Sequence, residues 1–392
     1  MEFKFSKKEE LLQWAVNDFA EKELTDKALV TLDHVPKNII KKMGDLGFFG
    51  LRIPEKYKGK PATWVMIGIL AEEIAKANIA CAYWVMLSYE VNLLLATYGT
   101  EEAKEEWLCN LVEANQLGCF SATESYAGSD MSAIETKAIR DQDFYLISGE
   151  KKPISFGMQA DVAVLFVKNN SEAGIRGISS FLVPVDSPGI TKSSIKNMGL
   201  FPSAPASFIL DKVRVPVKYR IGDEGEGSHL HTYMGFLSDF HQIISGIISL
   251  GAAQAAMRLA IAYSKQRVAF GRPIAKFEAV SEKIAEDATL IEAARWLCYR
   301  ALALKDQGLL NTKEAAMCGW WCPKVAFQVI EDALLIHGHT GYSDDLPLQQ
   351  MLRDIVAFEM ISGTENILKL IVSHETIGSV AMPDHLSDQF HN

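Results

Sequence analysis

The sequence predicts an α+β fold that is divided into three parts along the chain. Apolar residues recur every three or four positions in helices and every two in strands, so a change of period marks a change of structure. The helical period holds to about residue 118, a strand pattern follows to about 228, and the helical period then returns. We therefore expect an N-terminal α-helical domain (1–118), a central β domain (119–228) and a C-terminal α-helical domain (229–392).

Particular segments predict each part. Glu9–Phe19 has apolar residues at steps of three and four, as in an amphipathic helix. Ala160–Val167 and Ile178–Val185 are strand-like runs that are separated by turn-forming residues. The Ala-rich segment Ser249–Arg258 predicts a long helix, and Gly222–Gly227 is the clearest linker.

Composition excludes several classes of protein. A net charge of −10, with no long run of either sign, argues against binding to nucleic acid or to an anionic membrane. The first residues lack the apolar core of a signal peptide, and no charge-free stretch reaches the roughly 18 residues of a membrane helix. We expect a soluble, cytoplasmic protein.

The cysteines are dispersed, and in a cytoplasmic chain they are expected to be buried thiols rather than disulfides. Cys318 and Cys322 lie on consecutive helical turns, but no second pair and no histidine ladder completes a metal site. No metal is therefore expected. The six cysteines are Cys81, Cys109, Cys119, Cys298, Cys318 and Cys322.

The most informative segment is Cys119–Asp130, which combines small residues, hydroxyls and exposed backbone donors. It suits a flavin and its pyrophosphate, because glycine allows close backbone approach and hydroxyls or amides bind phosphate oxygens. An ordinary polar hairpin loop is the alternative. The segment resembles the T-E-P-x-A-G-S-D signature of the acyl-CoA dehydrogenase family, with Ser125 where proline is usual.

The resemblance extends over nearly the whole chain. Gly50–Gly59 is similar to G-x-x-x-P-E-x-Y-G-G, and Arg267–Ile274 is similar to R-x-x-F-G-x-P-I. Gly338–Tyr342, Arg353-Asp354 and Ser362–Ile367 then resemble G-G-x-G-Y, R-D and E-G-T-x-x-I. The resemblance implies FAD as cofactor, a small central β-barrel, and a C-terminal four-helix bundle that pairs subunits into a homodimer or homotetramer.

The resemblance also implies the FAD contacts, some of them from a partner subunit. Arg267 suits a pyrophosphate, because a guanidinium is always charged and binds bidentately. A solvated helix-end arginine is the alternative. His339 replaces the second glycine of G-G-x-G, which puts the phosphate contact there in doubt. The residues expected to bind FAD are Phe120, Thr123, Gly128, Ser129, Ser155, Arg267, Phe270, Gly338, Thr364 and Asn366.

Gly149–Gly157 is similar to G-x-K-x-W-I-T-N-G, with two replacements. Ser155 replaces a threonine that hydrogen-bonds the flavin ring, and a hydroxyl survives this change. Pro153 replaces a tryptophan beside the ring, so either the flavin face is more open or Phe156 fills the gap.

The chain departs from the family at the catalytic base. A carboxylate is needed to take the α-proton of an acyl thioester. In most of the family this carboxylate immediately precedes the G-T of E-G-T, and this chain has Ser362 at that position. Some members carry the base on the first long helix of the bundle, at the position of His241, and histidine can act as a base near pH 7. Gln242 replaces an arginine that often binds the CoA end. Glu90, a lone carboxylate in an apolar helix, is another candidate acid or base.

Each candidate has a structural alternative: His241 as a core or surface histidine, and Glu90 as an interface residue paired with a cation. We expect an FAD-dependent oxidoreductase that acts on an acyl thioester of CoA or of a carrier protein, with a displaced or absent base. A redox-neutral, oxygenating or non-catalytic flavoprotein of the same fold is the alternative.

Overall fold

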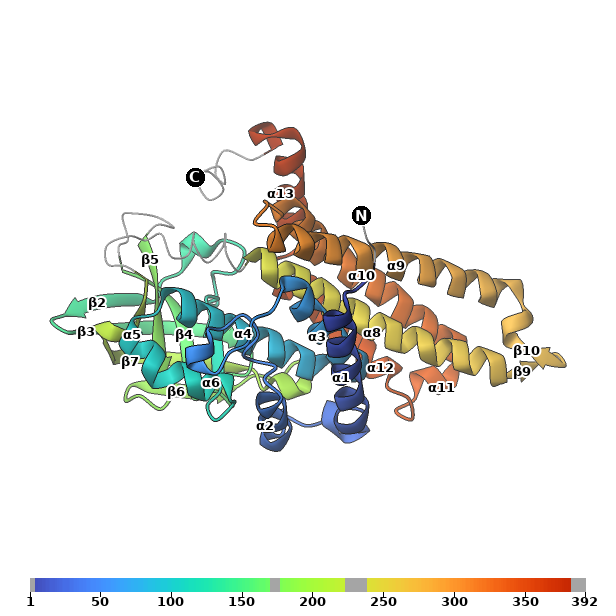
Figure 1. Cartoon of the computed structure of the whole chain (residues 1–392), viewed down its shortest axis with the longest axis horizontal. Coiled ribbons are helices and arrows are strands. Elements are labelled where there is room, and N and C mark those ends of the chain that lie inside the picture. Colours follow the sequence, from blue (N-terminus) through green and yellow to red (C-terminus); the bar gives the residue numbers. More distant parts are fainter. Residues whose placement is uncertain (1–3, 170–176, 223–237, 382–392) are drawn as a thin grey trace.

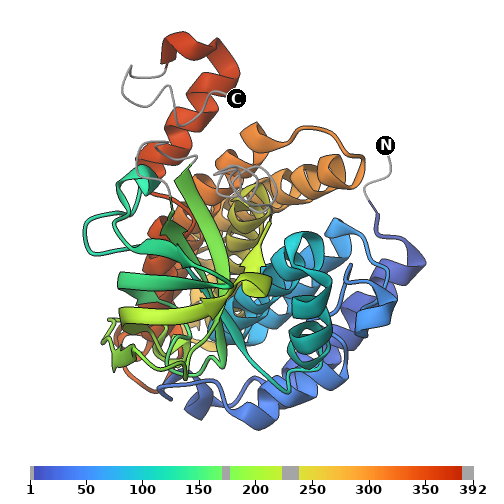
Figure 2. The same cartoon turned by 90° about the vertical axis from the view of Figure 1, so that its left-hand side faces the viewer.

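The computed structural model describes residues 4–169, 177–222 and 238–381. The strands gather at one end of the molecule, and the long C-terminal helices extend from there to the opposite end (Figure 1). Viewed from the strand end, the N-terminal helices lie beside the sheet (Figure 2).

The N-terminal helices arise from apolar stretches with polar residues at their starts. The side chains of Thr63 and Asn78 each accept a hydrogen bond from the amide three residues later and cap the helices that follow. These helices are α3 (Trp64–Ala77) and α4 (Ile79–Tyr98). α4 is buried on nearly every face because α3, β1 and α8 surround it. The other helices are α1 (Lys7–Glu23), α2 (Lys37–Asp45), α5 (Glu101–Ala103) and α6 (Cys109–Val112).

The central strands form one mixed sheet in the order β6-β7-β3-β2-β4-β5-β8, with β1 parallel to β4. The two predicted strands correspond to β4 and β5, which pair antiparallel over seven residues. No pair joins β6 to β8 among the described residues, so the closed barrel stays a prediction. The strands are β1 (Gly118–Ser121), β2 (Lys137–Asp141), β3 (Phe144–Ile154), β4 (Val162–Lys168), β5 (Ile178–Pro184), β6 (Ile190–Ser194), β7 (Ala206–Pro216) and β8 (Arg220–Ile221).

In the C-terminal part, α10 lies at the centre and contacts α8, α9, α12 and α13. A short hairpin of β9 and β10 joins α8 to α9 at the end of the bundle farthest from the sheet (Figure 1). The predicted linker lies almost wholly outside the described residues. The elements are α8 (Asp239–Gln266), β9 (Val268–Ala269), β10 (Arg272–Pro273), α9 (Glu278–Asp306), α10 (Thr312–His337), α11 (His339–Tyr342), α12 (Leu348–Ile361) and α13 (Glu365–Ile377).

Among the described residues, two helices, α4 and α8, are long and apolar enough to cross a membrane by length and composition alone. Their most apolar windows are 94% and 72% buried inside the protein, respectively. Core helices of this length pass the same test, so we interpret both as core helices.

Candidate functional site

Two predicted acid–base residues that are far apart in the sequence lie in direct contact. Nδ1 of His241, on α8, lies 2.6 Å from Oε1 of Glu90, on α4. The Glu90 side chain is fully buried and that of His241 is 9% exposed. The ring of Phe120 lies edge-on to the imidazole, with centroids 6.4 Å apart. The pair is thus enclosed where α4, α8 and β1 meet.

The pair sits on helix faces that point at one another. Tyr83, Met86 and Glu90 are spaced by three and four residues, so they form one stripe along α4. Tyr83 is hydrogen-bonded to Ser155 at 2.8 Å between the hydroxyl oxygens, and Sδ of Met86 lies 3.8 Å from Oγ of Ser245. The stripe therefore connects the segment of Ser155 to α8.

Ser362, the residue predicted to replace the usual catalytic glutamate, lies beside the same stripe. It is buried, and its hydroxyl donates a hydrogen bond to that of Ser245, one turn after His241 on α8. The carbonyl of Ile361 interacts with the imidazole of His241. His241 therefore contacts the Ile361–Ser362 segment, where the sequence analysis expects the usual catalytic base to be replaced.

The surroundings of His241 favour its protonated form. Burial alone would lower the pKa of His241, but the Glu90 carboxylate and the Ile361 carbonyl outweigh it and raise the pKa above its usual value. Oε2 of Glu90 is buried and has no partner among the described residues. Glu90 thus holds Nδ1 of His241, and Nε2 has no side-chain hydrogen-bond partner among the described residues, so we expect proton exchange at Nε2.

The predicted cofactor loop is tied to β3 by a buried ion pair. Nζ of Lys151, which is fully buried, donates to Oε1 of Glu124 at 2.7 Å and to the Ala122 carbonyl at 2.9 Å. Glu124 also accepts hydrogen bonds from the amides of Glu135 and Thr136. Burial lowers the pKa of Lys151 to about 8, against the opposing effect of Glu124. The ion pair fixes the start of the loop and leaves its tip exposed.

The exposed part of this loop fits an anionic cofactor. A Cβ added to Gly128 would meet no atom within 4 Å, so space is open beside the backbone there. In the described part of the chain, the amides of Gly128 and Ser129 donate to no backbone acceptor. Oγ of Ser121, at the end of β1, is buried without a partner in the same described part. Donors of this kind suit phosphate oxygens.

Of the two residues considered beside the flavin ring, Pro153 is exposed and Phe156 is buried. Pro153 is exposed, as expected if no large aromatic wall covers that position. Phe156 is 1% exposed and packs edge-on against Trp84, with ring centroids 4.2 Å apart. Phe156 is thus a core residue against α4.

The remaining predicted cofactor residues lie elsewhere. Arg267 and Phe270 are exposed on the β9–β10 hairpin, with Phe270 at 95%. In Figure 1 this hairpin is at the opposite end of the molecule from the strands. Gly338 is exposed at the end of α10, and Thr364 is the N-cap of α13, followed by the exposed Asn366. A single chain therefore does not bring all the predicted cofactor segments together.

Sequence reasoning missed three residues of the site: Tyr83, Lys151 and Ser245. Lys151 stood in a quoted motif, but a lysine in a strand that carries other charged residues gives no sign of burial. Tyr83 lies on the same face of α4 as Glu90, and Ser245 lies on the same face of α8 as His241. This helical spacing identifies Tyr83 and Ser245 as site residues only after Glu90 and His241 are known to be in contact.

Comparisons with known proteins show the family to which this chain belongs. Three family models match in order: the acyl-CoA dehydrogenase N-terminal domain over 6–115, the middle domain over 119–213 and the C-terminal domain over 239–377. An acyl-CoA dehydrogenase of Bacillus subtilis (strain 168) is 35% identical over 376 residues, which cover 94% of this chain and 97% of the relative. An acryloyl-CoA reductase (NADH) of Anaerotignum propionicum is 34% identical over 382 residues, 96% of each chain. The solved complex of glutaryl-coenzyme A dehydrogenase with glutaryl-CoA is 32% identical, covers 96% of this chain and 97% of its own, and gives a TM-score of 0.93.

Proposed function

Because this chain belongs to the acyl-CoA dehydrogenase family, we propose that it is an FAD-dependent oxidoreductase that interconverts an acyl thioester and its α,β-unsaturated form. The thioester is carried by CoA or by a carrier protein. The observation that carries the proposal is the buried contact between His241 and Glu90, beside Ser362 and Phe120. It provides a proton-transfer group where the family's usual glutamate is missing.

The roles of the residues follow from their contacts. When bound, FAD supplies the hydride chemistry at the β-carbon of the substrate. Nε2 of His241 takes the α-proton in the oxidative direction and returns it in the reductive direction. Glu90 orients the ring through Nδ1 and stabilises the imidazolium that forms. The Thr123–Ser129 loop, Ser155 and Phe120 would hold the cofactor.

The proposal is tested with the purified protein. We expect it to carry non-covalent FAD, and the flavin absorbance should bleach anaerobically when a saturated acyl thioester is added. A panel of acyl-CoA and acyl-carrier thioesters identifies the substrate class. A protein that is colourless and cannot be reconstituted with FAD would contradict the proposal.

The rate of α-proton exchange is expected to depend on pH in a direction set by Glu90. A base must be neutral, so exchange in the oxidative direction should fall as the pH drops through the raised pKa of His241. Glu90→Gln keeps an acceptor for Nδ1–H but removes the charge, so burial then dominates and the midpoint should move to lower pH. Exchange of thioester α-protons with deuterated buffer, followed from about pH 5 to 9, measures both midpoints. A midpoint that is the same in both proteins would refute the role of Glu90.

The hairpin of Arg267 and Phe270 is expected to complete the cofactor site of a second subunit. In Figure 1 the hairpin lies at the opposite end of the molecule from the central sheet, where the Thr123–Ser129 loop follows β1. Arg267→Ala should weaken FAD binding roughly 10- to 150-fold, since a hydrogen bond to a charged group contributes about 1.5–3 kcal/mol. Fluorescence titration of the apoprotein with FAD measures the effect.

Arg272→Ala is the matched control, because Arg272 carries the same charge on the same hairpin and lies over the ring of Phe277, at 4.1 Å from the ring centroid. It should bind FAD as the parent does. Equal affinity in the parent and Arg267→Ala, or a protein that binds FAD as a monomer, would show that the hairpin does not contribute to the site.

A further inference from the structure

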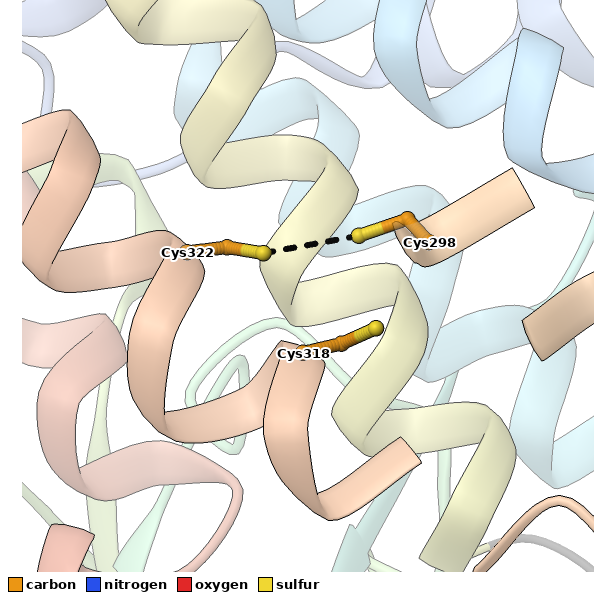
Figure 3. A group of neighbouring side chains, drawn as sticks. All are labelled: Cys298, Cys318 and Cys322. Carbon is orange, nitrogen blue, oxygen red and sulfur yellow. Dashed lines mark hydrogen bonds between the residues drawn. The ribbon is translucent and has the colours of Figure 1, made fainter. Parts of the chain in front are cut away.

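Three thiols meet in the core of the C-terminal helices (Figure 3). The sulfur atoms of Cys298, Cys318 and Cys322 all lie within 4.8 Å of one another, and Sγ of Cys298 is 3.5 Å from Sγ of Cys322. All three residues are 0% exposed, and all are free thiols. Cys298 comes from α9 and the other two from α10, so this set, which we call the trithiol cluster, is made only by folding.

We propose that the trithiol cluster is a binding site for a trivalent, three-coordinate thiophilic centre, namely arsenic(III) supplied as arsenite. The proposal is independent of the proposed function, because none of the three thiols contacts the His241–Glu90 pair in the described structure.

The spacing of the sulfurs fits one central atom. Metal–thiolate bonds are about 2.3 Å long, so three sulfurs around one atom lie at most about 4 Å apart. The thiols are already within 4.8 Å, so closing on a ligand needs movements on the order of 1 Å. The cluster lies between α9 and α10, and α8 covers it on a third side at Gly246. A Cβ added to Gly246 would lie 3.3 Å from Sγ of Cys298. A larger residue there would crowd the cluster.

Charge decides which ligand the cluster suits. Burial, the other thiols and Glu314 have the largest effects on the pKa values of these thiols. No cation is among these main influences, so none of these groups would balance a negative charge on the cluster. Three thiolates around Cu(I) would leave two negative charges, and around Zn²⁺ they would leave one negative charge and an unfilled fourth position. A charge in such a core is costly. Three thiolates around arsenic(III) leave none.

The binding step conserves atoms and charge. As(OH)₃ exchanges its three hydroxyls for three thiolates: three As–O and three S–H bonds break, three As–S bonds and three O–H bonds form, and three water molecules leave. No electrons are transferred. Cys318 and Cys322 lie one turn apart on α10, so both can bind the same arsenic atom from one helix while Cys298 closes on it from α9. Since the cluster is sealed, entry requires local opening of the helices and should be slow.

Native mass spectrometry of the folded protein after prolonged incubation with arsenite tests the proposal. The parent should gain one arsenic and lose three hydrogens, whereas binding to two thiols would retain a hydroxyl on arsenic. Cys298→Ala should lose the three-thiol product, and Cys318→Ala should do the same if Cys298→Ala does not fold. Cys81→Ala and Cys119→Ala remove buried thiols from outside the cluster and should bind as the parent does.

Dilute urea, below the unfolding transition, should accelerate binding because it increases local opening. No adduct under these conditions, an adduct that keeps its hydroxyl, or an unchanged adduct in a folded Cys298→Ala or Cys318→Ala protein would overturn the proposal.

Discussion

Replacing His241 with glutamine is expected to slow α-proton exchange of an acyl thioester by roughly 10²- to 10⁴-fold, the usual contribution of a positioned acid or base. Glutamine can still donate a hydrogen bond to Glu90, so the buried carboxylate keeps a partner. It cannot accept a proton at neutral pH. The measurement is deuterium incorporation at the α-carbon, with FAD bound to both proteins.

His337→Gln is the matched control for this experiment. His337 is also buried, lies on α10, contacts the Ala333 carbonyl through Nδ1 and stacks on Tyr263 with ring centroids 4.3 Å apart. The exchange rate of this variant should equal that of the parent. Parent-like exchange in His241→Gln would show that another group moves the proton.

Restoring α-proton exchange with a carboxylate at position 362 tests whether this position faces the substrate. Ser362→Glu, introduced into the His241→Gln protein, places a carboxylate beside Ile361 and Ser245, at the position used by most of the family. We expect it to restore part of the exchange. Failure of this rescue in a protein that still binds FAD would show that Ser362 does not face the substrate.

Much of the fold could be predicted because its signals are local. Helical spacing in Glu9–Phe19 corresponds to α1, and the two strand-like runs correspond to β4 and β5. The motifs at Cys119–Asp130 and Arg267–Ile274 indicate the family from the sequence alone, and the family models confirm it. Barrel closure depends on pairing between strand edges, which no local pattern specifies.

The candidate site could be predicted as residues but not as contacts. Glu90 and His241 stood out singly, as a carboxylate and an imidazole in apolar helices, yet 151 residues separate them. Their pairing depends on how α4 packs against α8. The same holds for Cys298, which joins Cys318 and Cys322 only when α9 and α10 pack. Long-range packing therefore creates both the acid–base pair and the trithiol cluster.

Replacing Lys151 with methionine is expected to destabilise the folded protein by about 3 kcal/mol, near the lower end of the range for breaking a buried ion pair. Lys151 is fully buried and the Glu124 side chain is 9% exposed, so the charge left on Glu124 is poorly solvated. The amides of Glu135 and Thr136 still donate to it, which limits the loss. Urea unfolding followed by circular dichroism measures the free energy.

The same change should weaken FAD retention, because the freed carboxylate no longer fixes the start of the Thr123–Ser129 loop. Lys152→Met is the matched control, since this neighbouring lysine is exposed and should tolerate the replacement. Lys151→Met combined with Glu124→Gln separates charge from packing. Glutamine still accepts from the two amides without a buried charge, so the double variant should recover most of the lost stability. A double variant as unstable as Lys151→Met would mean that Lys151 acts through packing of its aliphatic chain, and that the ion pair does not anchor the loop.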